Sequence, residues 1–257
     1  MTGTRTTSRA SGSPVARVTD PAPLAVRGKT SRGQRTRRRL IWAAEKVFGD
    51  VGFYDARVSE ITREAGVALG TFYLYFRSKH ELFDALIQAI NHDLRRTLSE
   101  GTQHLSSRAD AEARGLEIFF YDFLPRHRKL YRIIKQAEFA NPRIFEWYYR
   151  RIADGYARRL RAAMDAGEFR RWDGELAAFA LMGIADFVAM RYVTWGDGLP
   201  REKLDELTDF ALRGLATDGG ADAPSGRRPS RALRGSRLRR AAPAPPGSKG
   251  RYGARRR

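Results

Sequence analysis

Residues 66–79, which read GVALGTFYLYFRSK, constrain the fold more than any other stretch of the 257-residue chain. Four of the five positions from Phe72 to Phe76 are aromatic, and basic residues follow at once. With 3.6 residues per helical turn, Leu69, Phe72 and Phe76 share an arc of roughly 60°. Gly70, Thr71, Leu74 and Tyr75 cover the opposite side. The spacing therefore predicts a short helix with one buried and one exposed face.

A second short helix is predicted directly before this one. Val58, Ile61 and Ala65 recur at helical spacing, and Ala65-Gly66-Val67 separates the two helices. Two short helices joined by such a turn form a helix-turn-helix, which we place at 57–76. In the DNA-binding form of this motif, the second helix lies in the major groove.

The flanking segments complete a DNA-binding domain predicted at 34–94. A helix is expected from Leu40 to Phe48, after the basic run 35–39. A solvated face explains this run, and so does contact with backbone phosphates. Ser78 and Glu81 have the spacing of a capping box, which predicts the start of a long fourth helix reaching Leu94.

These residues resemble the N-terminal domain of tetracycline-repressor-type (TetR family) regulators. The resemblance rests on FGDVGF at 48–53, Val58-x-x-Ile61, Ala65-Gly66-Val67 and the aromatic helix. It departs from the family at Ala56 and Ala68, where Ser or Thr usually caps the second and third helices. The resemblance implies DNA contacts from the second helix of the motif, the recognition helix, and from the start of the fourth helix. The residues are Gly70, Thr71, Tyr73, Leu74, Tyr75 and Lys79.

The contacts are expected to fall into three kinds. Thr71, Leu74 and Tyr75 face outward and are expected to touch base edges, whereas Tyr73 and Lys79 flank that face and reach phosphates. Gly70 allows the backbone to approach the duplex closely.

Residues 95–217 are predicted to be helical, after a linker at 99–110. Helices are expected at 111–124, 128–140, 142–166, 174–194 and 201–216. The segment AAFALMGIADFVAMRYVTW at 177–195 is apolar nearly all round, which is typical of a buried helix. Within it Asp186 needs a hydrogen-bond donor, for which Arg191 is a candidate. The resemblance implies that this helix and the last one form a four-helix interface between two subunits; a core helix of a monomer is the alternative.

The segment 119–151 interleaves aromatic residues with arginine and lysine. A helical core with a solvated face explains this pattern, and so does a pocket for an elongated apolar ligand with an anionic end. Such segments resemble the ligand domains of TetR-family regulators of fatty-acid or aromatic-acid breakdown. The effector would then be an acyl-CoA or related lipophilic acid derivative, bound by Phe123, Arg128, Tyr131, Arg132, Phe139, Tyr148 and Asp186.

Charge separates the two ends of the chain from its middle. The net charge is +19, of which +5 falls in 1–33 and +10 in 218–257. Both tails are rich in Gly, Pro, Ser and Arg, so we predict two disordered basic arms. An architectural, nucleoid-type protein that coats DNA through these arms is therefore the alternative to a sequence-specific regulator.

Other classes of protein are disfavoured. The chain has no cysteine, no HExxH, GxSxG, P-loop or GxGxxG motif, and no run of 18 apolar residues. Its histidines lack the i,i+4 spacing of a metal site. The alternative of an enzyme on a helical scaffold is thus supported by no catalytic motif. We expect no cofactor, no bound metal and no association with a membrane. The sequence predicts an all-α, homodimeric, cytoplasmic repressor that binds a palindromic double-stranded DNA operator and is released by a small-molecule effector.

Overall fold

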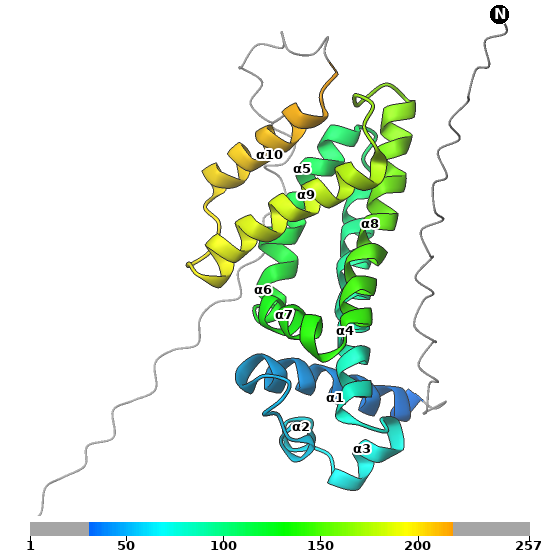
Figure 1. Ribbon diagram of the computed structural model, residues 1–257, viewed down its shortest axis with the longest axis vertical. Helices are drawn as coiled ribbons and strands as arrows, with labels where there is room; N and C mark the ends of the chain where they lie inside the picture. Colours follow the sequence, from blue (N-terminus) through cyan, green and yellow to red (C-terminus); the bar gives the residue numbers. More distant parts are fainter. Residues whose placement is uncertain (1–30, 218–257) are drawn as a thin grey trace, which may run out of the picture. The chain divides into compact units, whose positions relative to one another are not determined.

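The computed structural model describes residues 31–217, and within them every regular element is a helix (Figure 1), which confirms the predicted all-α class. The predictions for the two basic arms fall almost wholly outside the described residues. In chain order the elements are α1 (Ser31–Val51), α2 (Val58–Glu64), α3 (Leu69–Tyr75), α4 (Lys79–Thr102), α5 (Arg108–Ile118), the π-helical turn η1 (Phe119–Phe123), α6 (Leu124–Arg126), α7 (Leu130–Ala140), α8 (Pro142–Asp165), α9 (Gly174–Ala189), the π-helical turn η2 (Met190–Thr194) and α10 (Arg201–Leu215).

Helix α1 begins earlier than predicted. It starts at Ser31, so the basic run 35–39 lies inside the helix, and the helix begins before the expected domain boundary at 33 and 34. Arginine favours helix, and the segment between Gly33 and Gly49 holds no glycine or proline to stop it. Arg39 donates hydrogen bonds to the carbonyls of Ala65 and Gly66, the latter at 3.2 Å. It thereby holds α1 against the turn between α2 and α3, where Gly66 has a φ of +63° that favours glycine.

An aromatic cluster holds α1 to α4 together. Phe48, Phe53, Phe72, Phe76 and Phe83 are all fully buried. The ring of Phe83 lies 5.3 Å from that of Phe48 and 4.7 Å from that of Phe53, centroid to centroid. Because α2 and α3 each have seven residues, they are too short to be stable alone, and this packing keeps them in place.

The caps agree with the sequence in part. The hydroxyl of Ser78 accepts a hydrogen bond from the backbone N–H of Glu81 and caps α4, as predicted. Ala68 is the N-cap residue of α3 and provides no side-chain bond. The N-cap of α2 is Arg57 rather than Ala56, and the Arg57 N–H donates to the Glu60 carboxylate at 2.9 Å.

Helix α4 runs without interruption from the end of the helix-turn-helix into the C-terminal half (Figure 1). It passes through the predicted boundary at residues 94 and 95 and reaches Thr102, and α5 begins at Arg108, so the non-helical part of the expected linker at 99–110 is only 103–107. Helix α8 packs against α4, α7 and α9. A carbonyl on α8, that of Tyr148, accepts a hydrogen bond of 2.9 Å from the buried Asn91 on α4.

Helix α9 is less buried in the single chain than its composition predicts. Phe187 on α9 is 70% exposed and Phe210 on α10 is 65% exposed. Gly174–Thr194 is also the one stretch of the described residues that is long and apolar enough to cross a membrane, by length and composition alone. One side of α9 nevertheless packs on α8. The phenol of Tyr131, not Arg191, donates to Asp186 at 3.1 Å, because α7 brings that hydroxyl close.

Polar contacts join α1 to the helices above it. The buried imidazole of His127 lies 2.8 Å from Glu45 on α1 and 3.3 Å from Asp93 on α4. Nearby, Lys129 pairs with Asp50, and the Gln136 side chain accepts a hydrogen bond from the N–H of Phe53. Burial alone lowers the pKa of His127, but the two carboxylates outweigh it and raise that pKa above its ordinary value.

We expect His127→Gln to destabilise the protein most under mildly acidic conditions. A raised folded-state pKa means that the stabilisation is fully present below about pH 6.5 and is lost as pH rises through the folded pKa. Denaturant unfolding of wild type and variant at several pH values, at one protein concentration, measures this. A stability difference that is the same at every pH would show that the imidazolium charge does not strengthen the contacts of His127 with Glu45 and Asp93.

Candidate nucleic-acid interface and ligand cavity

Helix α3 has one buried and one exposed face. Phe72 is fully buried, and Phe76 directly after the helix is 1% exposed, whereas Leu74 is 65% exposed. Leu69 was expected on the buried arc but is 50% exposed. It is the first residue of the helix, whose buried side begins one turn later with Phe72.

The residues expected to contact DNA are distributed over this exposed face and its border. Gly70, Tyr73 and Leu74 are exposed, while Thr71 and Tyr75 are half-buried. A Cβ atom at Gly70 would meet nothing within 4 Å, so the glycine is not required by the chain's own packing. The ring of Tyr73 stands edge-on to Phe72 at 5.1 Å, which orients its phenol at the rim of the face.

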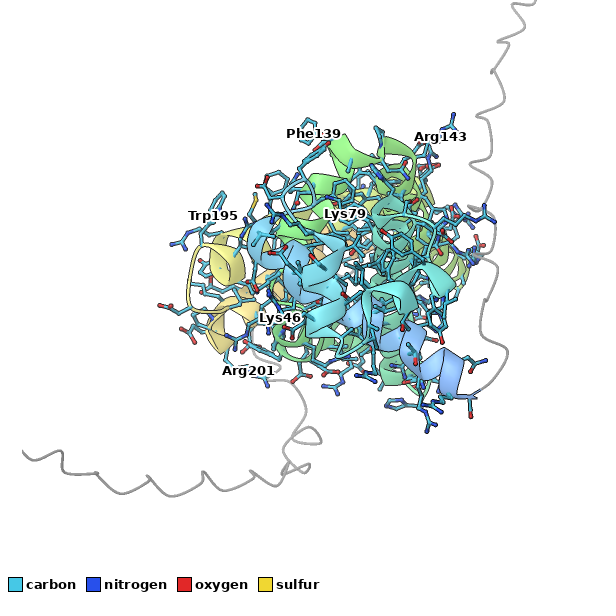
Figure 2. The ribbon with its side chains drawn as sticks, turned by 90° about the horizontal axis from the view of Figure 1, so that it is seen from below. Lys46, Lys79, Phe139, Arg143, Trp195 and Arg201 are labelled. Atoms are coloured by element: carbon cyan, nitrogen blue, oxygen red, sulfur yellow. The ribbon has the colours of Figure 1, made fainter. Side chains whose placement is uncertain are left out.

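Lys79 is held by the protein itself. Its ammonium donates to the carbonyls of Tyr54 and Ala56, both at 2.9 Å, and lies 4.8 Å from the ring centre of Phe53. Burial lowers the pKa of this lysine. Lys79 lies with Lys46 on the end of the molecule seen from below in Figure 2. Two of the three ammonium protons therefore bind the loop after α1, and one remains for a phosphate.

Exposed arginines lie on the elements that precede and follow α3 in the chain. Arg35 and Arg38 lie on α1, Arg57 and Arg63 on or beside α2, and Arg77 follows α3. Arg37 instead covers the ring of Phe76 at 5.0 Å. Exposed guanidinium groups on the helices of a DNA-binding motif suit the phosphates that border a DNA groove.

A cavity of about 110 Å³ lies between α4, α5, α8 and α9. A single buried water needs roughly 10–15 Å³, so this space is large enough for a small organic molecule. Most of its wall is apolar. The apolar lining comprises Leu94, Leu98, Ala111, Leu116, Phe119, Ile152, Leu181, Met182 and Ala185.

Two polar clusters also line the cavity. In the first, Asp186 accepts hydrogen bonds from Tyr131 and Tyr149, and burial raises the pKa of its carboxyl. In the second, the carboxylate of Glu112 accepts a hydrogen bond from Tyr156 and lies 3.2 Å from the guanidinium of Arg108. Burial likewise raises the pKa of Glu112.

The predicted ligand residues are only partly brought together. Tyr148 and Asp186 line the cavity, and Tyr131 reaches it through its bond to Asp186. Phe123 is buried with its ring 4.6 Å from that of His127, outside the cavity. The structure leaves the other three, Arg128, Arg132 and Phe139, exposed on the surface, where Figure 2 shows Phe139 pointing outward.

Sequence reasoning missed Arg108, Glu112, Tyr156 and Arg159. Arg108 and Glu112 have the i,i+4 spacing of an ordinary solvated ion pair. Only the tertiary fold, in which Tyr156 of α8 binds Glu112, brings the pair to the cavity wall. In the part of the chain that the structure describes, no group of three or more acidic or histidine side chains could hold a metal ion.

Comparison with known proteins agrees with this geometry. Residues 40–86 match the family model "Bacterial regulatory proteins, tetR family". The chain is 29% identical over 197 residues to the HTH-type transcriptional regulator YdgC of Bacillus subtilis, covering 74% of this chain and 97% of YdgC. It is 27% identical over 187 residues to the HTH-type transcriptional regulator BetI of Escherichia coli K12, covering 71% of this chain and 95% of BetI.

The fold is that of a solved relative. The fatty acid degradation regulator FadR from Bacillus halodurans superposes with a TM-score of 0.62 at 22% identity, over 69% of this chain and 94% of that one. The matched family segment contains α2, α3 and the start of α4, which are the elements that form the exposed recognition face. The chain therefore belongs to the TetR family of DNA-binding, helix-turn-helix transcriptional regulators, which are not enzymes.

Proposed function

We propose that this chain acts as a homodimeric repressor that binds a palindromic operator and is released by a small lipophilic ligand. The observation that carries the proposal is the continuity of α4. Only three residues separate this helix from α3, and it supplies Leu94, Leu98 and Thr102 to the wall of the cavity. A ligand that shifts α4 would also shift the recognition helix.

Release of DNA then follows from a change in population. Two recognition helices of a dimer must match major-groove faces about 34–36 Å apart. A ligand that binds better to a dimer of different spacing favours that form by its difference in affinity. The contact between Glu45 on α1 and His127 at the end of α6 supports such coupling. It links the first helix of the DNA-binding domain to the C-terminal helices.

The proposed DNA contacts keep their division of roles. Thr71, Leu74 and Tyr75 read base edges, Gly70 permits close approach, and Tyr73 contacts phosphate. Lys79 contributes its remaining proton to a phosphate while holding the carbonyls of residues 54 and 56.

Homodimerisation through α9 and α10 is supported by the apolar side chains that these helices leave exposed. They include Leu176, Phe179, Phe187 and Phe210, a density of large apolar groups that marks an interface. In a cytoplasmic dimer the second subunit would cover these apolar side chains, so α9 would need no membrane around it. For the ligand, the apolar cavity and the fold shared with a fatty acid degradation regulator support an acyl-CoA or related lipophilic acid derivative.

The alternative is an architectural protein that binds DNA mainly through its basic arms, supported by the charge of +10 in residues 218–257. Duplexes selected from a random library, together with footprinting upstream of the protein's own gene, separate the two. A regulator prefers its selected site over random DNA by about 10³-fold or more. An architectural protein would give no enriched site.

We expect Leu74→Ala to change which base pairs are preferred without weakening binding to random DNA. A good base contact discriminates by about 1–3 kcal/mol, whereas non-specific affinity comes from phosphate contacts. Repeating the selection with the variant measures this. Val51→Ala, an exposed apolar residue at the end of α1, is the control that keeps the wild-type profile. An unchanged profile for Leu74→Ala would remove this residue from the reading face.

We expect Phe187→Asp to give monomers and to abolish operator binding. A charge placed in a buried apolar interface is unfavourable, and one monomer reaches only one half-site. Light scattering gives the mass and anisotropy gives the binding. Phe139→Asp is the matched control, because Phe139 is 75% exposed on α7, away from α9 and α10. Monomers of wild-type protein that bind the operator would contradict the proposed dimer.

A further inference from the structure

One end of the cavity carries more positive than negative charge. Arg108 on α5 and Arg159 on α8 both line it, and Glu112 is the carboxylate between them. In residues 31–217 the guanidinium of Arg159 makes neither a hydrogen bond nor an ion pair within 4 Å. Burial lowers the pKa of Arg159, and repulsion from Arg108 adds to this effect.

The contact between Arg108 and Glu112 leaves hydrogen-bonding capacity unused. The Nε of Arg108 lies 3.2 Å from Oε1 of Glu112, but the two are not aligned as donor and acceptor. Within the described residues both buried atoms lack a hydrogen-bond partner. A buried polar atom without a partner costs free energy, so the N–H at Nε of Arg108 gains from an acceptor on a bound molecule, whereas the Glu112 oxygen would gain only from a donor.

The opposite end of the cavity has no such requirement. Asp186 is hydrogen-bonded by the phenols of Tyr131 and Tyr149, so its oxygens have donors without any ligand. Arg159 and Tyr149 are ten positions apart on α8, which separates the two ends by about 15 Å along the helix. Between them the wall is formed by apolar side chains such as Ile152, Leu181 and Met182.

We infer that the ligand is a free monocarboxylic acid, whose carboxylate is bound by Arg159 and Arg108 and whose apolar chain or ring extends toward Asp186. An arginine fork matches the geometry of a carboxylate and binds it with two parallel hydrogen bonds. An acyl thioester has an uncharged carbonyl at this position and cannot form that ion pair. The inference rests on the proposed function and narrows its ligand class to free acids. It concerns only ligand binding, which is measured separately from the release of DNA.

Calorimetric titration of the full chain tests the inference. The probes are hexanoate, octanoate, decanoate and phenylacetate, compared with octanol, octylammonium and octanoyl-CoA. We expect at least one carboxylate to bind at least about tenfold more tightly than octanol, octylammonium or octanoyl-CoA, since hydrogen bonds to charged groups are strong. Tighter binding of octylammonium or octanoyl-CoA, or binding of no carboxylate, would overturn the inference.

Variants locate the carboxylate. Arg159→Met should weaken carboxylate binding about tenfold or more and leave the affinity for octanol unchanged, while Arg159→Lys should lose less. Arg158→Met is the matched control, because the neighbouring Arg158 is exposed and does not line the cavity. Thermal unfolding of each variant verifies the fold. Equal carboxylate affinity in Arg159→Met and wild type would exclude this arginine.

A separate measurement keeps this inference distinct from the proposed function. Fluorescence anisotropy follows a preformed complex of the full chain with its selected duplex during titration with the same carboxylate. If the carboxylate binds in the calorimeter but leaves the complex intact, the carboxylate site stands and ligand-controlled release fails. If DNA is released only by compounds that bind equally well to Arg159→Met, release stands and the carboxylate site fails.

Discussion

The burial of Phe72 and Phe76 is the contact on which the rest of the recognition surface depends. Helix α3 has only seven residues, too few to persist without tertiary support. Phe72 of α3 and Phe76 directly after it share one hydrophobic core with Phe48, Phe53 and Phe83, and truncating such a ring typically costs about 3–5 kcal/mol. Once this side of α3 is fixed, helical geometry presents Gly70, Tyr73 and Leu74 to the outside.

Helix α4 carries the consequences of that packing to the other half of the molecule. The Ser78 cap fixes its start beside α3, and its far end forms part of the cavity wall. The imidazole of His127 and the ion pair between Lys129 and Asp50 hold α1 against α6 and α7. Any motion of α1 relative to these helices must rearrange such short polar contacts, which favours discrete positions over continuous bending.

Helix α9 faces two surroundings at once. Met182, Ala185 and Asp186 line the cavity, whereas the adjacent Phe187 is directed away from it and exposed. Because successive residues are about 100° apart, a ligand on one side and a second subunit on the other would contact the same few turns. A shift of α9 caused by a ligand in the cavity would therefore also change the surface of α9 that the proposed interface uses.

The sequence alone determined the helical class, the helix-turn-helix at 57–76, the Ser78 cap and the helices near 128–140, 142–166 and 174–194, because periodicity and capping are local properties. Only the tertiary structure decided which charged side chains face the cavity. Arg128 in the turn before α7 and Arg132 on α7 are exposed, whereas Arg159 on α8 lines it. Helical spacing shows which residues share a face, but the helix that covers that face comes from a distant part of the chain. Arg108 and Glu112 reach the cavity wall through the packing of α5, and Tyr156 of α8, a distant part of the chain, binds Glu112 there; no pattern within α5 contains that fact.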